Sequence, residues 1–410
     1  MHWIYKRLYD LMFGAGLVLT GPALMYLKNR PLNYMLSRLM PCKGKDIESK
    51  VWIHSVSLGE TNAAIPLIKD LANIGISTLA TASTPTGFEN LQRRLQSPIC
   101  LAPWDMFFCV ENLINKIKPR LLVIMETELW PALIVGTRDK ETKIIIANAR
   151  ISDKAFRAYK RHKWFTEYLL GYVDMILAQN QEHADRFEEL GMPPHRIQIT
   201  GNLKYDVEIR EQTILSNNSS GKITLLLAST HNNEEELILE ELKTSSLLNK
   251  VFLIIAPRHI ERVNQIEELL ARYQIKFALY SKTKGMMPHN ASALIIDTIG
   301  ILPHAYKYAD ITFIGGSLIN HGGQNPIEAA YWQTPIFFGP NMDNFKDIAK
   351  NLLDAAGAIQ IQNPKQLLPY INESRIQELK ALGINAKRVV EKNRGAKEKT
   401  IKYILSMINQ

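Results

Sequence analysis

Cysteine is scarce in this chain of 410 residues. Only three occur, Cys42, Cys100 and Cys109, and none of them forms a CxxC pair. An odd number of isolated cysteines is not typical of a disulfide framework or of a structural zinc site. We therefore expect neither, and a reducing cytosolic compartment fits the sequence better.

The sequence also lacks the patterns of nucleic-acid-binding modules. It has no Cys/His pairs at zinc-finger spacing, no basic region that leads into heptads and no aromatic RNA-binding strand motif. The formal net charge is nevertheless +9 at pH 7, so the surface should attract nucleotides, phosphates or acidic lipid head groups. We expect such an anionic partner, and no nucleic acid.

Long uncharged apolar runs are missing except at residues 11–27, which basic residues flank on both sides. This run is at the short end for a bilayer-spanning helix, and Gly21 and Pro22 interrupt it, so it could span or lie in the interface. A cleaved signal peptide and a buried core helix are the alternatives, but no small-residue cleavage site follows. We expect an N-terminal hydrophobic membrane anchor over residues 1–45, with the body of the chain in the cytoplasm.

The rest of the chain repeats short apolar runs, each ending in a small or polar residue or Pro and followed by a helix-like stretch. This alternation is typical of parallel strands buried on both faces, in an α/β doubly wound sheet. The runs are too many for one sheet, so we expect two Rossmann-like domains that face each other across a ligand-binding cleft. The predicted strands lie at 50–56, 77–83, 121–127, 143–150, 174–180, 197–202, 223–230, 251–258, 293–298, 311–317 and 335–340.

Domain boundaries follow from the polar stretch 217–221, which is the best linker candidate. Together with the anchor, it predicts one domain over 46–210 and a second over 211–375. The helix-like segment that ends the chain, 376–410, is rich in Lys and Arg and is predicted to be a closing helix on the outside.

Polar side chains occupy the strand-to-helix turns of the first half. Glu60 opens a helix after the first predicted strand, where a carboxylate could take a proton from an attacking hydroxyl. The alternative is a helix N-terminal acid whose pKa the helix dipole lowers. Ser57 and Thr84 lie in this turn and the next, and Glu126 and Glu128 follow a third strand. These two acids could orient acceptor hydroxyls, or they could be caps and salt-bridge partners.

In the second half, a glycine-rich segment joins a strand to a helix. It includes Gly316 and Ser317 and leads to Asn325, Pro326 and Glu328. Glycines let a backbone approach a phosphate, and a helix N-terminus offers free N–H groups, so this is the best candidate anion site. A capping box explains Asn325 and Glu328 equally well, but not the four glycines before them. Glu328 could instead accept hydrogen bonds from a ribose diol.

Two other strand ends of the second half carry charged groups. Pro257 and Arg258 place a guanidinium where it could hold a phosphate or carboxylate with two parallel hydrogen bonds. His231 and the acids at 234–236 resemble a metal site, but three acids that open a helix are better interpreted as a solvated first turn.

A basic and aromatic segment lies at 157–173 and includes Lys160, Arg161, Lys163 and Trp164. This composition suits a membrane surface with anionic head groups, although an ordinary exposed helix fits equally well.

Taken together, the motifs over residues 50–350 resemble the bacterial transferases of 3-deoxy-D-manno-octulosonic acid (Kdo), which act in lipopolysaccharide assembly. The motifs that carry the resemblance are HSVSLGET, TASTPTG, METELWP, NARIS, GNLKYD, THNNEEE, APRH, DTIG and GGSLINHGGQNPIEAA.

The resemblance implies a GT-B fold of glycosyltransferase family 30. It implies inverting transfer of Kdo from CMP-Kdo to the lipid A precursor, lipid IVA, at the cytoplasmic face of the inner membrane, with no cofactor and no required metal. It also implies Glu60 as general base. The positions implied for CMP binding are Pro257, Arg258, Gly300, Ile301, Gly316, Ser317, Asn325 and Glu328.

The sequence departs from the family pattern at Ile301, where an acidic residue is expected, and at Gln324, where histidine is expected. Two other functions fit the residues. One is a GT-B enzyme that uses a UDP-sugar, such as a transferase or epimerase, and the other is a membrane-attached nucleotide-binding or scaffold protein.

Overall fold

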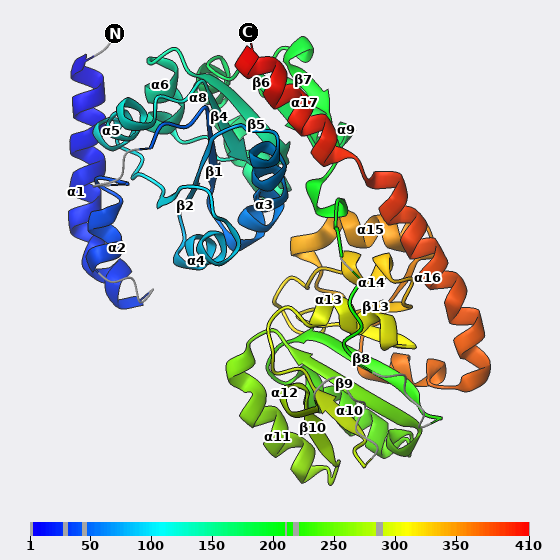
Figure 1. Cartoon of the computed structure of the whole chain (residues 1–410). Helices are drawn as coiled ribbons and strands as arrows, with labels where there is room; N and C mark the ends of the chain where they lie inside the picture. Colours follow the sequence, from blue (N-terminus) through cyan, green and yellow to red (C-terminus); the bar gives the residue numbers. More distant parts are fainter. Residues whose placement is uncertain are drawn as a thin grey trace. The chain divides into compact units, whose positions relative to one another are not determined.

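The computed structural model describes residues 3–27, 32–42, 47–209, 211–215, 221–283 and 290–409. These residues form two compact units (Figure 1). The first unit comprises Met1–Asp206 and Arg394–Gln410, and the second comprises Val207–Asn393. Most of the predicted linker at 217–221 lies outside the described residues.

A seven-stranded parallel sheet forms the centre of the first unit, in the order β3-β2-β1-β4-β5-β6-β7. Alternate residues of its strands enter different apolar clusters: Leu122 and Ile124 pack on one face, and Leu121 and Val123 on the other. Burial on both faces is why these strands appear as continuous apolar runs. The strands are β1 (Val51–Ser55), β2 (Thr78–Ala82), β3 (Ile99–Leu101), β4 (Leu121–Met125), β5 (Lys143–Ala149), β6 (Met175–Ala178) and β7 (Ile197–Ile199).

Helices cover both faces of this sheet. Buried residues of α3, α4 and α17 belong to one apolar cluster, and those of α5, α6, α8 and α9 belong to the other. The helices are α3 (Leu58–Asn73), α4 (Pro85–Arg94), α5 (Phe107–Ile117), α6 (Pro131–Arg138), α7 (Asp153–Arg161), α8 (Lys163–Leu170), α9 (Gln181–Glu189) and α17 (Ala396–Asn409).

The second unit has its own seven-stranded parallel sheet, in the order β10-β11-β9-β8-β12-β13-β14. Its strands are β8 (Ile223–Thr230), β9 (Val251–Pro257), β10 (Phe277–Leu279), β11 (Ala293–Ile295), β12 (Ile311–Ile314), β13 (Ile336–Phe338) and β14 (Ala358–Gln360). Its helices are α10 (Glu234–Thr244), α11 (Val263–Arg272), α12 (Tyr280–Thr283), α13 (Leu302–Ala305), α14 (Ile327–Tyr331), α15 (Lys346–Asp354) and α16 (Glu373–Asn393).

The predicted class, α/β with two doubly wound parallel sheets, is confirmed, and each of the eleven predicted runs contains a strand. Three strands were not predicted: β3, β10 and β14. Each has three residues and lies at the edge of its sheet. A strand of three residues gives only a weak apolar signal, although β7, β11 and β13 are equally short and were predicted.

The predicted anchor contains α1 (Trp3–Leu27) and α2 (Leu32–Ser37). None of the described helices is both long enough and apolar enough to cross a bilayer. Polar groups hold α1 against the first unit: the Asp10 carboxylate accepts hydrogen bonds from the backbone of Phe107 and Phe108, at 2.7 and 3.1 Å. Lys6 forms ion pairs with Glu111 and Asp139, both at 2.7 Å.

The prediction of a single closing helix at 376–410 was wrong. The segment forms two helices, α16 and α17, and the backbone between them has Gly395 at φ +95°. A left-handed residue ends helical hydrogen bonding, and glycine adopts it without steric cost. The break also separates the units, because α16 belongs to the second and α17 to the first.

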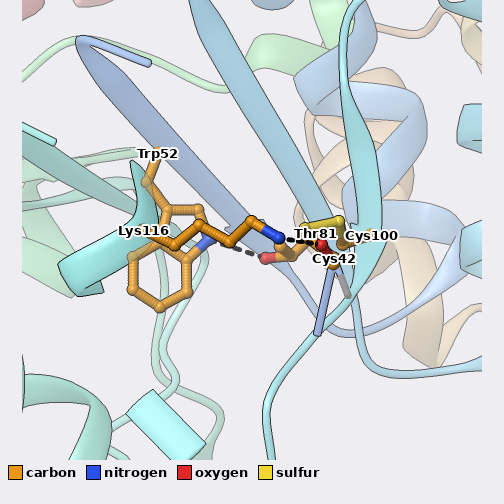
Figure 2. Close-up of a disulfide and its surroundings, with 5 residues drawn as sticks. All are labelled: Cys42, Trp52, Thr81, Cys100 and Lys116. Atoms are coloured by element: carbon orange, nitrogen blue, oxygen red, sulfur yellow. Dashed lines mark hydrogen bonds between the residues drawn. A yellow bond between two sulfur atoms is a disulfide. The ribbon is translucent and has the colours of Figure 1, made fainter. Parts of the chain in front are cut away.

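The prediction of no disulfide was also wrong. Figure 2 shows Cys42 bonded to Cys100, with a Cα–Cα distance of 5.6 Å, while Cys109 is free and buried. Lys116 donates a hydrogen bond to the Cys42 carbonyl beside the disulfide. Residues 58 positions apart become neighbours because the chain after α2 lies against β3, and no local sequence pattern reveals such a contact.

Candidate active site

Glu60 is held at the start of α3, directly after β1. Ser57 is the N-cap of this helix, and the two side chains form a capping box. One Glu60 oxygen accepts from the Ser57 hydroxyl at 2.8 Å and from its backbone N–H at 3.2 Å. The other accepts from the backbone N–H of Val56 at 2.7 Å. The capping alternative is therefore realised in the structure.

The cap does not, however, keep the Glu60 carboxyl strongly acidic. Its side chain is buried, and burial raises its pKa from 4.5 to about 7, against the opposing hydrogen bond from Val56. The negative charges of Glu126 and Glu128 raise it further. A carboxylate with a pKa near neutrality is suited to general-base catalysis, so the cap and the base can be the same residue.

Glu126 lies at the end of β4 in a left-handed backbone conformation, with φ +58°. Its carboxylate forms ion pairs with Arg150 at 2.7 Å and with Lys204 at 3.6 Å. Burial lowers the pKa of Lys204, and the charges of Glu126 and Glu60 partly oppose this effect. A strained, non-glycine backbone beside paired charges is typical of a functional site.

Lys204 and Arg150 were not predicted as site residues, although they lie in the motifs GNLKYD and NARIS. The signal that could have found them is their position: Arg150 immediately follows β5, and Lys204 follows β7 by only a few residues. Both therefore belong at the same carboxyl edge of the sheet as Glu126.

Glu128 is the second acid after β4. It accepts a hydrogen bond from the Trp130 indole at 2.5 Å, and burial raises its pKa. Thr84 is the N-cap of α4 and donates to the Val56 carbonyl at 2.9 Å. The structure thus brings together the residues predicted for this edge of the first unit, namely Ser57, Glu60, Thr84, Glu126 and Glu128.

The predicted membrane-surface residues lie at the end of α7 and the start of α8, on the first unit. Lys160, Arg161 and Lys163 are all exposed, and the Trp164 side chain is 74% exposed. Lys160 forms an ion pair with Glu189.

In the second unit, strand pairing places Arg258 next to His231. Thr230 of β8 pairs with Pro257 of β9, and the backbone N–H of Arg258 donates to the Thr230 carbonyl at 2.9 Å. His231 and Arg258 each follow these paired residues, so they are neighbours at the carboxyl end of the sheet. The Arg258 side chain is partly exposed there.

The glycine-rich segment after β12 is folded around a carboxylate of the protein itself. Backbone N–H groups of Gly316, Ser317 and Leu318 donate to Glu234, at 2.6, 3.1 and 3.1 Å. Gly316 and Ser317 were predicted to bind the nucleotide, but their backbone N–H groups are bonded to Glu234. The N–H groups that were predicted to be free are those at the start of α14, and Glu234 does not use them. Ser317 is fully buried, and its hydroxyl receives a hydrogen bond from the backbone of Gly339 at 2.8 Å.

The four glycines have their own structural explanation. A Cβ on Gly315 would lie 2.5 Å from the Thr230 Cα, and Gly316, Gly322 and Gly323 all have φ between +68° and +78°. The segment therefore needs glycine in order to fold closely against β8, whether or not a ligand binds there.

The remaining positions predicted for the nucleotide lie around α13 and α14. Asn325 accepts a hydrogen bond from the Ile327 backbone at 3.1 Å, and the helix begins at Ile327 with Pro326 as N-cap, one residue later than predicted. Gly300, at φ +88°, and Ile301 precede α13. Glu328 is partly exposed, and its charge contributes to raising the pKa of the buried Tyr306.

The interpretation of the acids after His231 as a solvated first turn was wrong for Glu234 and Glu235, which are buried and have structural roles. Glu234 holds the glycine-rich segment, and Glu235 forms an ion pair with Arg262 at 2.8 Å and accepts from the Thr230 hydroxyl at 2.6 Å. In the part of the chain that the structure describes, no group of three or more His, Cys, Asp or Glu side chains is arranged to hold a metal ion.

Solved structures with this fold include a glycosyltransferase from Rickettsia africae. It aligns with 88% of this chain and 99% of its own at 14% identity, with a TM-score of 0.56. The UDP-GlcNAc 2-epimerase of Neisseria meningitidis bound to UDP-GlcNAc aligns with 87% of this chain and 99% of its own, at 11% identity and a TM-score of 0.58. The chain therefore has the two-domain α/β fold of the GT-B class. Because transferases and epimerases share this fold, the fold alone does not choose between those activities.

Sequence comparison makes that choice. A family model described as 3-deoxy-D-manno-octulosonic-acid transferase (kdotransferase) matches residues 33–207. The 3-deoxy-D-manno-octulosonic acid transferase of Haemophilus influenzae is 31% identical over 365 residues, which are 86% of this chain and 85% of that one. The chain belongs to the Kdo transferase family of lipopolysaccharide biosynthesis, as its motifs predicted.

Proposed function

We propose that this chain transfers Kdo from CMP-Kdo to the lipid A precursor, lipid IVA, with inversion at the anomeric carbon of the sugar. The observation that carries the proposal is the pKa of Glu60, which burial raises to about 7. A carboxyl group with this pKa can be ionised at neutral pH and still accept a proton with a useful driving force.

Glu60 has capacity left for this reaction. A carboxylate has about four lone-pair sites, and the capping box uses three of them, two on one oxygen and one on the other. The remaining site, on the oxygen bound to Val56, can accept the proton of an acceptor hydroxyl. As the oxygen of the acceptor hydroxyl attacks the anomeric carbon, the bond from that carbon to the CMP phosphate breaks, and this single displacement inverts the anomeric centre.

Lys204 and Arg150 supply positive charge beside Glu60 and Glu126. Without these two cations, the carboxylates of Glu60, Glu126 and Glu128 would repel the acceptor, which is itself anionic. We therefore assign these two cations to acceptor binding and to stabilising the ionised form of Glu60.

The second unit supplies the groups for the donor. Glu234 already occupies the N–H groups of the glycine-rich segment. The partly exposed guanidinium of Arg258 is therefore the group that we assign to the departing CMP phosphate, where positive charge is needed as the bond breaks.

We further propose that the first unit lies on the cytoplasmic surface of the inner membrane through α1. The helix combines basic residues near its start with exposed apolar side chains, which suits an interfacial helix better than a spanning one. The exposed apolar residues of α1 are Ile4, Tyr5, Leu8, Leu11, Met12, Val18 and Leu19. Exposed Trp164 and its basic neighbours on the same unit suit the same surface.

Replacement of Glu60 tests the proposal. With CMP-Kdo and lipid IVA as substrates, Glu60→Gln should lower turnover by about 10²- to 10⁴-fold, the usual contribution of general-base catalysis. The affinity for CMP should be unchanged, because the groups that we assign to CMP belong to the second unit and Glu60 belongs to the first. Near-normal turnover by this variant would refute the role of Glu60.

A panel of sugar-nucleotide donors tests the reaction itself, and mass spectrometry of the products shows how many sugars are added. We expect turnover with CMP-Kdo and none with UDP-sugars. The reverse result would contradict the proposed donor and favour the UDP-sugar alternative that the fold permits.

A further inference from the structure

Three histidines gather at the carboxyl end of the second sheet, beside Arg258. The rings of His231 and His321 are stacked, with centroids 4.2 Å apart and planes 18° from parallel. The His259 ring meets His231 edge-on, at 5.7 Å and 79°. His231 is buried, whereas His259 and His321 are exposed. One ring of the cluster is thus buried in the protein, and the other two are accessible to solvent.

The fold holds His231 in this position by several constraints. Ser229 has φ +54°, where the pairing of β8 with β9 shifts register, and this turns the chain before His231. Gly316 lies beneath the ring, since a Cβ there would approach its Cδ2 to 3.2 Å. The Gln324 side-chain nitrogen lies 3.0 Å from the ring Nε2.

The cluster lies beside the Arg258 guanidinium and contains no carboxylate. Among the residues that the structure describes, none of the three rings forms an ion pair with a carboxylate. The nearby acids are already engaged, Glu234 by backbone N–H groups and Glu235 by Arg262. Burial and the charges of His321, His259 and Arg258 lower the pKa of His231 to about 4. An anion placed here would be attracted by the positive charge of Arg258 and could accept hydrogen bonds from the ring N–H groups.

Hydrogen-bond donors are available for such an anion. With the Gln324 amide nitrogen as donor, Nε2 of His231 is the acceptor, and the ring proton is on Nδ1. The exposed rings of His259 and His321 can each donate through a nitrogen as well.

We propose that His231, His259 and His321 form a subsite that binds the carboxylate of the donor's acidic sugar, next to the phosphate held by Arg258. This inference rests on the proposed function. Kdo is an ulosonic acid, so its carboxyl carbon is bonded to the anomeric carbon that carries the phosphate. A side chain adjacent to the phosphate-binding guanidinium is therefore in reach of the carboxylate.

The departure at Gln324 fits this arrangement. The family pattern places histidine there, and this chain has glutamine, which holds His231 through its amide. His321 supplies an imidazole three residues earlier, and it stacks on the same ring.

The test compares two ligands that differ in the sugar. In the full-length protein, KM is measured for CMP-Kdo, and the inhibition constant is measured for CMP, which lacks the carboxylate. His321→Ala and His259→Ala change exposed residues and should fold normally. Each should raise the donor KM by about tenfold, the effect of one charge-assisted hydrogen bond, and leave the CMP constant unchanged.

His231→Gln, which keeps a polar partner for Gln324, should raise the donor KM in the same way. His195→Ala is the matched control, because His195 is an exposed histidine of the first unit and should change neither constant.

Other results would overturn the subsite. Equal loss of affinity for CMP and CMP-Kdo would assign the rings to the phosphate, and no change in either would show that they bind no part of the donor. A wild-type protein that neither binds CMP nor uses CMP-Kdo would instead refute the proposed function, which is a different outcome.

Discussion

At the scale of the residue, Glu60 combines two roles that the sequence presents as alternatives. The capping box predicts a carboxylate stabilised by the start of a helix, and such a group should have a low pKa. Burial among Glu126 and Glu128 outweighs the cap. The motif alone could not decide this, because burial depends on the packing of distant segments around the turn.

The raised pKa of Glu60 has a consequence for stability. Because the folded pKa of about 7 exceeds the ordinary value of 4.5, the folded state binds more protons between these values. Its contribution to stability is present below pH 4.5 and is lost as the pH rises to about 7. Glu60→Gln removes this loss. The melting temperature of the variant minus that of the wild type should therefore increase as the pH rises from 4.5 to about 7. A difference that stays constant with pH would show that the carboxyl group titrates normally.

Arg258 is the residue that we assign to the donor phosphate. Arg258→Ala should weaken CMP binding by about 2 kcal/mol, the value of a charge-assisted contact. Isothermal titration with CMP measures this effect. Arg272→Ala is a suitable control, since that guanidinium is on the same unit, is 64% exposed and pairs with Glu236. Equal affinities in the wild type and Arg258→Ala would remove Arg258 from the site.

Sequence reasoning found most of the candidate site because polar residues at strand ends converge in parallel sheets. It misjudged the glycine-rich segment for a physical reason. Glu234 is 82 residues before Gly316, and only the fold brings its carboxylate to those N–H groups. The backbone N–H groups of Gly316, Ser317 and Leu318 are thus already bonded in the structure, and only those at the start of α14 stay as predicted candidates.

At the scale of the element, α1 stabilises its neighbour as well as exposing apolar residues. The N-cap of α5 is Met106, which has no side-chain hydrogen bond to the helix. Asp10 of α1 supplies this function from a distant part of the sequence, by accepting from the first two N–H groups of α5. The N-terminal helix is therefore part of the folded first unit.

Removal of this distant cap should destabilise the protein. Asp10→Ala leaves two helix N–H groups without their acceptor and should cost about 1–2 kcal/mol, as loss of an N-cap does. Asp10→Asn retains one acceptor oxygen and should lose less. Urea unfolding at equal m-values measures both. If Asp10→Ala is as stable as the wild type, α1 does not cap α5 in solution.

All eleven predicted strands exist, and the three that were missed are edge strands of three residues. The short strands β11 and β13 were predicted because they are fully buried, and β7 was found although it too is a short edge strand. The closing helix at 376–410 was misjudged because its amphipathic pattern continues through the segment. Only Gly395 marks the break, and a single glycine near a helix end is a weak signal in a sequence.

At the scale of the whole molecule, the chain passes from the first unit to the second and back again. The returning helix α17 is fixed at both ends by the first unit. The Asp206 carboxylate accepts from the backbone of Gly395 and Lys397, both at 2.6 Å. Lys143 and Arg120 donate to the carbonyls of Met407 and Ile408, at the other end of the helix.

Apolar contacts of α17 should make it essential to the first unit. Ile404 is fully buried in the cluster that includes β1 and α3. Ile404→Ala should cost about 2–5 kcal/mol, as large-to-small changes in a core do. Ser406→Ala, at an exposed position of the same helix, should cost almost nothing. Equal unfolding free energies for the two variants would show that α17 is not part of the core.

The return of α17 also bears on how the protein is made. Residues 394–410 are synthesised after the whole of the second unit, yet they complete the core of the unit whose strands emerged first. The nascent first unit must therefore wait, with the part of one sheet face that α17 covers still exposed beside α3 and α4, until the second unit has been synthesised. A chaperone that shields apolar surface would meet that exposed part during translation, and truncation of the chain before residue 394 would damage the unit formed by its N-terminal half.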